Sequence, residues 1–250
     1  MKSIKVRNLI LGEGMPKICV PVTGVTEEEI LKQTKEAAKQ HPDLLEWRAD
    51  FYEALFEQEK VEALAGKIRE ILVDVPLIFT IRTSAEGGNC KITPEDYVDI
   101  LKKTAKSEAV DLIDVEWFMK DLEREALVKT LHEEKKIIVA SNHHFHETPS
   151  VADMEEILQV MEDTEADIRK LAVMPSEAED VLKLLIATVH ANKTGEAPVI
   201  TMSMSGLGAV SRVCGQVFGS IVTFGTVGAA SAPGQLEITQ LRRMLEQLQP

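Results

Sequence analysis

The stretch that decides the fold is residues 137–174, IIVASNHHFHETPSVADMEEILQVMEDTEADIRKLAVM. Two short, mostly apolar runs, Ile137–Asn142 and Ile168–Met174, lie at its ends. Between them, after the candidate N-cap Ser150, apolar residues recur at helical spacing: Met154, Ile157, Leu158 and Met161. A short apolar strand, a helix and a second such strand are typical of a βαβ unit in a parallel sheet that is buried on both faces.

The same alternation runs through the whole chain of 250 residues. Six further apolar runs are Ile18–Val22, Leu44–Arg48, Leu77–Arg82, Leu112–Trp117, Val199–Met204 and Ile221–Phe224. Amphipathic segments separate them, and a final one lies at Leu236–Leu248. Eight strands alternating with helices predict an α/β fold, a (β/α)8 TIM barrel that forms one domain over residues 1–250. A doubly wound sheet is the alternative, but no GxGxxG follows the first strand and GxxxxGK[ST] occurs nowhere.

Local signals mark the ends of several elements. Thr26 with Glu29, and Ser176 with Glu179, fit capping boxes at the start of helices. Residues 1–16 alternate loosely between apolar and polar side chains and end in glycines and a proline. We therefore expect an N-terminal β-hairpin that closes the bottom of the barrel, where the strands begin.

The charge balance excludes some classes of partner. The chain has 28 basic and 41 acidic residues, so its net charge is −13. This argues against nucleic acid, which needs a cationic face, and against an anionic membrane surface. Cys19, Cys90 and Cys214 are odd in number and lack CxxC spacing, which favours a reducing compartment. No secretion signal or membrane-spanning run is evident, so we expect a soluble cytoplasmic protein.

Polar residues gather where the expected strands end, the face that carries the chemistry of a barrel. Glu46 and Arg48 alternate onto the same face of their strand. Other polar residues at such ends are Arg82, Glu86, Asp114, Glu116, Arg212 and the run Ser141–Glu147. Charged residues at strand ends are usually just solvated, so none of them indicates a function by itself.

Lys170 is the exception because it lies inside the apolar run IRKLAVM. If its side chain lines the barrel, the cost of burying an ammonium lowers its pKa. A neutral amine is what Schiff-base formation with a ketone requires. Alternation alone leaves the opposite arrangement open, in which Arg169 points inward and Lys170 faces the helices.

A polar cluster follows the fifth strand directly: His143, His144, His146 and Glu147. These residue types suggest a metal site, but on a continued strand His143 opposes His144 and His146. A single histidine at a strand end, near a lysine on the next strand, suits general acid–base catalysis better. We therefore predict one functional histidine and no metal.

Seven of the fourteen glycines lie between Gly206 and Gly234. Their backbone N–H groups could hold a phosphate, as loops near the last two barrel strands often do. Ser231–Gln235 instead fits a mobile flap, since small residues surround one rigid proline before a long polar side chain. An ordinary loop is equally compatible with this composition.

Together these residues resemble the type I 3-dehydroquinate dehydratase family (type I dehydroquinase) over nearly the whole chain. The motifs are Glu46-x-Arg48-x-Asp50, Arg82 with Glu86, Ser-x-His143-His-Phe, Lys170, Met202-Ser-Met204 with Arg212, and Phe224-Gly followed by Ser231-Ala-Pro-Gly-Gln235. The resemblance implies a shikimate-pathway hydro-lyase that converts 3-dehydroquinate to 3-dehydroshikimate. It also implies a barrel with an N-terminal hairpin, a homodimer, and no metal or organic cofactor.

The resemblance further implies roles for the residues. Lys170 would form an imine with the C3 ketone, and nearby arginines would keep its amine neutral. His143 would remove a C2 proton and then protonate the departing C1 hydroxyl in a syn elimination, while Glu86 orients His143. Arg212 would bind the substrate carboxylate, and Ser231 and Gln235 would close over it. Further substrate contacts would come from Glu46, Arg48, Arg82, Met202, Met204, Phe224 and Ala232.

The chain departs from the family pattern at three places. His144 stands where an acidic residue or asparagine is common, and Pro21 stands where a polar residue is common. Ser205–Gly208 replaces the commoner Met-Gly arrangement. Three other functions are alternatives: a Schiff-base aldolase acting on a sugar phosphate, a metal-dependent hydrolase using His143, His146 and a carboxylate, and a non-catalytic binding barrel.

Overall fold

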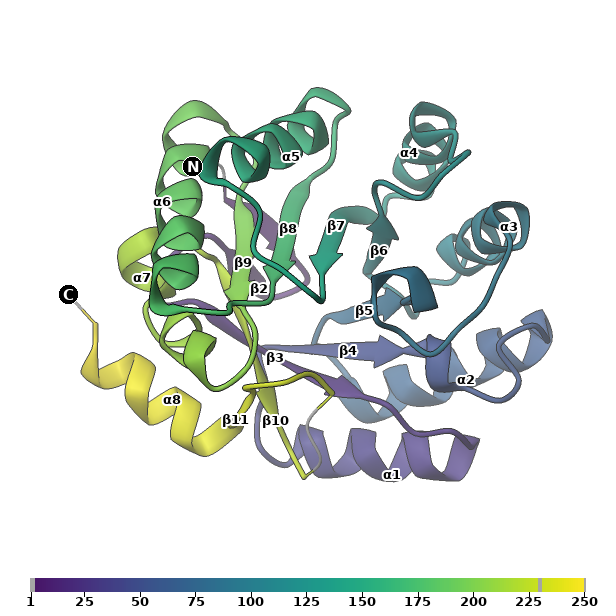
Figure 1. The fold of residues 1–250 in the computed structure, drawn as a ribbon. Coiled ribbons are helices and arrows are strands. Elements are labelled where there is room, and N and C mark those ends of the chain that lie inside the picture. Colours follow the sequence, from purple (N-terminus) through teal and green to yellow (C-terminus); the bar gives the residue numbers. More distant parts are fainter. Residues whose placement is uncertain (1–2, 229–230, 250) are drawn as a thin grey trace.

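The computed structural model describes residues 3–228 and 231–249, and a barrel of parallel strands forms its centre (Figure 1). The eight barrel strands are β3 (Lys17–Val22), β4 (Leu44–Arg48), β5 (Leu77–Thr80), β6 (Leu112–Glu116), β7 (Ile137–His144), β8 (Ile168–Val173), β9 (Val199–Ser203) and β10 (Val222–Thr226). Neighbours from β3 to β9 are hydrogen-bonded in chain order, and β10 pairs with β3. A doubly wound sheet reverses its strand order partway, so this order excludes that alternative.

The barrel closes least tightly between β9 and β10. A bridge joins Val199 to Ser220, and Ile221 N–H donates to the Val199 carbonyl at 2.9 Å. A short strand that was not predicted, β11 (Leu236–Glu237), pairs with β10. The predicted α/β barrel is confirmed, with a seam in place of one full ladder.

A layer of helices surrounds the strands (Figure 1). The capping box predicted at Thr26 and Glu29 is confirmed. The one predicted at Ser176 and Glu179 is wrong, because Asp180 accepts from both N–H and Oγ of Ser176 at 2.8 Å. The helices are α1 (Glu27–Ala38), α2 (Gln58–Leu72), α3 (Pro94–Ala105), α4 (Arg124–Glu133), α5 (Val151–Asp163), α6 (Ala178–Thr194), α7 (Gly215–Phe218) and α8 (Ile238–Gln247).

The predicted N-terminal hairpin is present. Its first two residues lie outside the described part of the chain. Val6 and Leu11 are buried against residues at the starts of the barrel strands, such as Leu44 and Leu112. An apolar plug therefore fills this end of the barrel, and the strand ends at the other mouth are left for polar side chains. The hairpin pairs two antiparallel strands, β1 (Ile4–Val6) and β2 (Leu9–Leu11).

The outward faces of the strands pack against the helices in a second, larger core. Trp47, Phe79 and Trp117 are fully buried there. The rings of Trp47 and Phe79 meet edge to face with centroids 5.3 Å apart. This packing fixes the strands from outside, so the inward side chains at their ends are held in place. Within the described residues, we find no helix whose length and apolar character suit a bilayer crossing.

Candidate active site

The two basic residues of β8 point in opposite directions. Arg169 points outward, where it pairs with Glu162 at 2.9 Å and donates to the carbonyls of Ala191 and Ala197. Lys170 points inward and lines a pocket at the open mouth of the barrel. The alternative with Arg169 inside is therefore excluded.

Two carboxylates hold the Lys170 ammonium. Its Nζ lies 3.0 Å from Oδ2 of Asp114 on β6 and 3.4 Å from Oε1 of Glu46 on β4. The ring of Phe224 lies below it, 4.8 Å from Nζ to the centroid. We expected arginines around this lysine, but its hydrogen-bonding partners are acidic. One of these carboxylates, Asp114, is shared between Lys170 and Arg82.

Arg82 follows β5 and forms the hub of this charge network. Its Nη2 lies 2.6 Å from Oδ1 of Asp114, and its Nη1 lies 3.2 Å from Glu116 and 3.0 Å from Ser141 Oγ. Glu86 is also within 3.4 Å. Burial opposes the charge of Arg82, but the three carboxylates outweigh it and raise the Arg82 pKa further above its usual value. The guanidinium is therefore a permanent cation inside the barrel.

His143 lies at the end of β7, and its Nδ1 is 2.8 Å from Oε2 of Glu86. Asn142 Nδ2 donates to the other oxygen of Glu86 at 3.0 Å, which fixes the carboxylate plane. Burial lowers the pKa of His143 well below its usual value, and the charges of Arg82 and Lys170 add to the shift. The imidazole is therefore neutral at neutral pH. Burial also raises the pKa of Glu86 to about 7, although Arg82 opposes this.

A tight turn brings Glu86 beneath His143. Glu86 ends the 3₁₀ turn η2 (Ser84–Glu86), and Gly87 follows with φ of 77°. A Cβ at Gly87 would lie 2.4 Å from the ring of Phe145, so the close approach of this loop to Phe145 requires glycine.

On the other side of the pocket lies a cation, Arg212, that pairs with no carboxylate among the described residues. Arg212 ends the 3₁₀ segment η3 (Leu207–Arg212), and its Nη2 donates to the Pro233 carbonyl at 3.0 Å. Within the described ranges, its Nε and Nη1 are buried and have no hydrogen-bond partner. Burial lowers the pKa of Arg212 to about 10, so it stays charged at neutral pH. A buried guanidinium with free donors is suited to a carboxylate.

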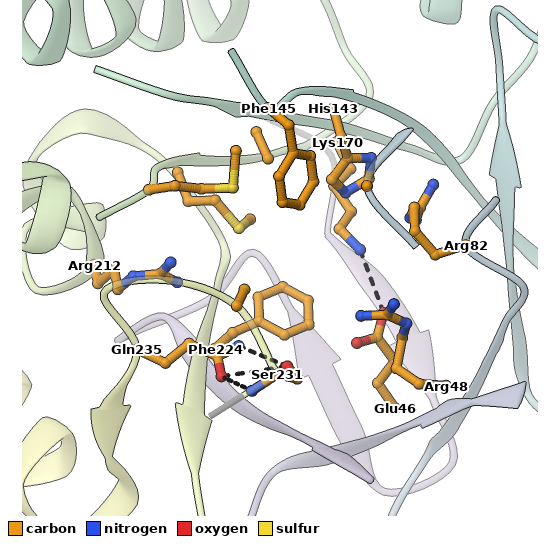
Figure 2. Close-up of a pocket in the computed structure, with 15 residues that line it drawn as sticks. Glu46, Arg48, Arg82, His143, Phe145, Lys170, Arg212, Phe224, Ser231 and Gln235 are labelled. Atoms are coloured by element: carbon orange, nitrogen blue, oxygen red, sulfur yellow. Dashed lines mark hydrogen bonds and ion pairs between the residues drawn. The ribbon is translucent and has the colours of Figure 1, made fainter. Parts of the chain in front are cut away.

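The segment predicted as a flap contacts this cation through Pro233, and Figure 2 shows Gln235 and Ser231 beside Arg212. Gln235 Oε1 accepts from the backbone N–H of Ser231 at 2.9 Å, and its Nε2 donates to Ser231 Oγ at 3.1 Å. A Cβ at Gly234 would lie 2.0 Å from the Ser205 carbonyl oxygen, so the flap sits directly on the loop after β9. Gly208 is likewise packed against Ser203 rather than open to a phosphate.

The pocket between these two sides comprises about 580 Å³ of space, part of which is open to solvent. Figure 2 shows Lys170, His143 and Phe145 on one wall, with Arg212 and Gln235 across from them. The predicted site residues that line it are Glu46, Arg48, Arg82, His143, Lys170, Met202, Met204, Arg212, Phe224, Ser231, Ala232 and Gln235. Glu86, the remaining predicted residue, lies behind His143.

The sequence-based site omitted some residues that the structure brings in. Gly87, Phe145 and Ala172 also line the pocket, and alternation from His143 and Lys170 could have indicated the last two. Asp114 and Ser141 do not line it but contact Arg82 from behind. No spacing in the sequence marks them as partners.

Two of the three departures from the family pattern, His144 and Pro21, lie apart from this pocket, whereas Ser205 of the third contacts the flap. His144 lies beside Glu147, and its ring nitrogen Nδ1 is 4.0 Å from the Glu147 carboxylate. Pro21 lines a separate groove beside α1. Across the described residues, no group of three or more His, Cys, Asp or Glu side chains is arranged to hold a metal ion.

Comparison with known proteins gives consistent matches. The family described as "Type I 3-dehydroquinase" matches residues 18–250. The 3-dehydroquinate dehydratase of Listeria welshimeri is 40% identical over 248 residues, covering 99% of this chain and 98% of the relative. That of Salmonella typhimurium is 43% identical over 246 residues, covering 98% of both.

Solved structures agree. The 3-dehydroquinate dehydratase of Geobacillus kaustophilus superposes with a TM-score of 0.97 at 40% identity, covering 99% of this chain and 96% of that one. The type I 3-dehydroquinate dehydratase of Clostridium difficile, described with covalently modified comenic acid, has a TM-score of 0.96 at 40% identity, covering 100% of this chain and 99% of that one.

Proposed function

The chain belongs to the type I 3-dehydroquinase family and is a 3-dehydroquinate dehydratase, a hydro-lyase; from this premise we propose that it eliminates water through an imine on Lys170. The observation that carries the proposal is the position of Lys170, whose Nζ is buried at the pocket wall between two carboxylates. His143 lies on the neighbouring strand and Arg212 lies across the pocket.

Imine formation comes first. The Lys170 ammonium first gives up one proton, and the neutral amine adds to the C3 carbonyl carbon. A second proton moves from the nitrogen to the carbonyl oxygen, which becomes the hydroxyl of the carbinolamine. The first proton then returns to that hydroxyl, which leaves as water, so ammonium and ketone become iminium and water with no change in total charge. The iminium withdraws electrons from C2 and acidifies its protons.

His143 carries the proton in the second stage. With Glu86 ionised and accepting from Nδ1–H, the Nε2 lone pair is free to remove a C2 proton. The resulting imidazolium then protonates the C1 hydroxyl, which leaves as water on the same face. One imidazole can serve both steps because the elimination is syn. Water finally hydrolyses the imine and releases 3-dehydroshikimate and the free lysine.

Substrate orientation comes from the remaining lining residues. Arg212 has two free donors for the C1 carboxylate, and the flap residues Ser231 and Gln235 cover that end. Glu46, Arg48 and Arg82 provide the polar wall for the C4 and C5 hydroxyls. The apolar wall is formed by Met202, Met204, Phe224 and Ala232.

We further propose that the protein is a homodimer in the cytoplasm and needs neither a metal nor an organic cofactor. Light scattering on a sizing column tests the dimer, since a 27.7 kDa chain then elutes at twice its mass. Elemental analysis of active enzyme tests the metal, and stoichiometric zinc or manganese would contradict the proposed lyase chemistry.

The deciding experiment is borohydride reduction in the presence of 3-dehydroquinate, followed by peptide mass mapping. We expect one covalent adduct, on Lys170, and none on the Lys170→Ala protein. Lys136 is a matched internal control, because it is a buried lysine whose Nζ donates to the backbone carbonyls of Ser107 and Val110. An adduct on any other lysine, or none at all, overturns the proposal.

A further inference from the structure

Among the described residues, Asp114 is the one carboxylate that touches the Lys170 nitrogen without lining the pocket. Its side chain has no exposure to solvent. One oxygen lies 3.0 Å from Lys170 Nζ, while the other lies 2.6 Å from both Arg82 Nη2 and Ser141 Oγ. Asp114 is therefore behind the reacting nitrogen, where the substrate cannot reach it.

The same nitrogen carries a positive charge before and after imine formation. The ammonium of the free enzyme and the iminium of the intermediate both have one positive charge, whereas the carbinolamine between them can be neutral. A fixed negative charge beside the nitrogen favours both cationic states over the neutral ones. For elimination, the relevant state is the iminium, because a neutral imine withdraws far less electron density from C2.

We propose that Asp114 is the counter-ion of the iminium and keeps it protonated while His143 removes the C2 proton. This rests on the proposed function, since it assigns a role within the Lys170 imine. Glu46 is less suited to this role, because it lies at 3.4 Å, lines the pocket and faces the substrate. Asp114 thus acts by holding a negative charge beside the imine nitrogen, and it does not contact the substrate carbon atoms.

The surroundings keep Asp114 ionised. Burial alone would raise its pKa, but the charges of Arg82 and Lys170 and a hydrogen bond from Ser141 outweigh this and hold the Asp114 pKa at about 2. The other titratable or charged groups around this centre are Cys19 on β3, Glu46 and Arg48 on β4, Glu86 in η2, Tyr97 on α3, Glu116 on β6 and His143 on β7.

The experiment compares the two stages in an Asp114→Asn variant. Without the negative charge, the ammonium gives up its proton more easily, so borohydride trapping of the imine at neutral pH should be as fast as in the parent or faster. Elimination should slow at least tenfold. The alkaline limb of kcat should also move to lower pH by about one to three units. A defect in packing alone slows both stages and leaves the pH limb in place.

Two further variants control for the network. Ser141→Ala removes a partner of Asp114 and Arg82 but no contact to Nζ, so the position of its pH limb should not move. Asp114→Glu restores the charge, and its pH limb should return toward that of the parent. If the limb moves equally in Ser141→Ala, or stays in place in Asp114→Asn, Asp114 is not the counter-ion.

A further measurement leaves Asp114 unchanged, so its result does not depend on whether the Asp114 variants fold. In His143→Ala the imine should form but not eliminate, so it can be observed by NMR of ¹⁵N-labelled lysine. The proposal requires a protonated imine nitrogen from neutral pH up to the pH at which the alkaline limb of kcat begins. A neutral imine at neutral pH refutes the role of Asp114. The absence of any imine on Lys170 refutes the proposed function itself.

Discussion

The two sides of the pocket differ in how their charges are satisfied. On the side built by β4 to β8, Arg82, Lys170 and their carboxylates pair with one another at 2.6 to 3.4 Å. On the side built by η3 and the flap, the Arg212 guanidinium is buried, and among the residues that the structure describes two of its nitrogens have no partner while the third donates to a backbone carbonyl. One side is electrostatically complete, and the other lacks an anion.

This difference separates two tasks. A complete network does not need to rearrange when the substrate arrives, so it can hold the Lys170 nitrogen and the His143 imidazole in fixed states. An unpaired buried cation gains most when a carboxylate enters, so it favours binding and closure. Changes on the network side should therefore alter kcat and its pH dependence, whereas changes on the flap side should alter the dependence on substrate concentration.

The largest effect should come from Arg212→Ala. Losing two charge-assisted hydrogen bonds of about 2 kcal/mol each lowers kcat/KM by about a thousandfold. Arg212→Lys keeps the charge but not the bidentate geometry, so its loss should be intermediate. Steady-state kinetics at several substrate concentrations measure both. A loss below tenfold in Arg212→Ala would mean that the carboxylate binds elsewhere and that the contrast between the two sides is wrong.

Glu86→Gln should produce the next largest effect, with kcat about a hundredfold lower. Glu86 works as a carboxylate, and its pKa is raised to about 7. As pH falls through 7 it gains a proton, so parent activity should decline on the acid side. The glutamine has no such proton to gain, and this acid limb should disappear from the profile of kcat against pH. If the acid limb is unchanged in Glu86→Gln, a group other than Glu86 causes it.

Gly234→Ala should raise KM about tenfold, because its Cβ would lie 2.0 Å from the Ser205 oxygen and prevent the flap from seating. Gly228→Ala is a matched control. Gly228 has a similar φ, 82° against 78°, but its Cβ would meet nothing within 4 Å. Both variants share the backbone strain, so only the first should affect KM. Equal effects would attribute the change to strain instead of flap contact.

The smallest effect should come from Ser231→Ala. It removes the Oγ contacts to Gln235 but keeps the backbone N–H bond at 2.9 Å. We expect KM to rise about threefold with kcat unchanged, in line with the loss of one neutral hydrogen bond. A fall in kcat of similar size would show that the flap also acts on the chemical step, and the division between the two sides would need revision.

The sequence was sufficient for the strand alternation and the hairpin, because both depend on local apolar periodicity. It could not choose between Arg169 and Lys170, because the choice depends on distant partners. Arg169 faces outward since its guanidinium reaches the Ala191 carbonyl near the C-terminus of α6, a site that favours cations. Only the packed barrel places that carbonyl beside β8.

Asp114 was not predicted as a site residue, because its role also depends on a partner that is distant in the sequence. It meets Lys170 across two intervening ladders, from β6 through β7 to β8. The register sets this meeting, since a shift by one residue would turn Asp114 to the other face. The false capping box at Ser176 shows the same limit at short range, because Glu179 and Asp180 are adjacent acids and geometry selects Asp180.

The hairpin at the bottom of the barrel also determines by which end the substrate and the product can enter and leave. Because Val6 and Leu11 plug that end, the part of the barrel that the structure describes opens at its other mouth, which is the route we expect for both substrate and product. A product that has not yet left blocks the next substrate outright. The product should therefore inhibit competitively. At high product concentration, the rate of turnover should depend on how often the product dissociates from the open mouth.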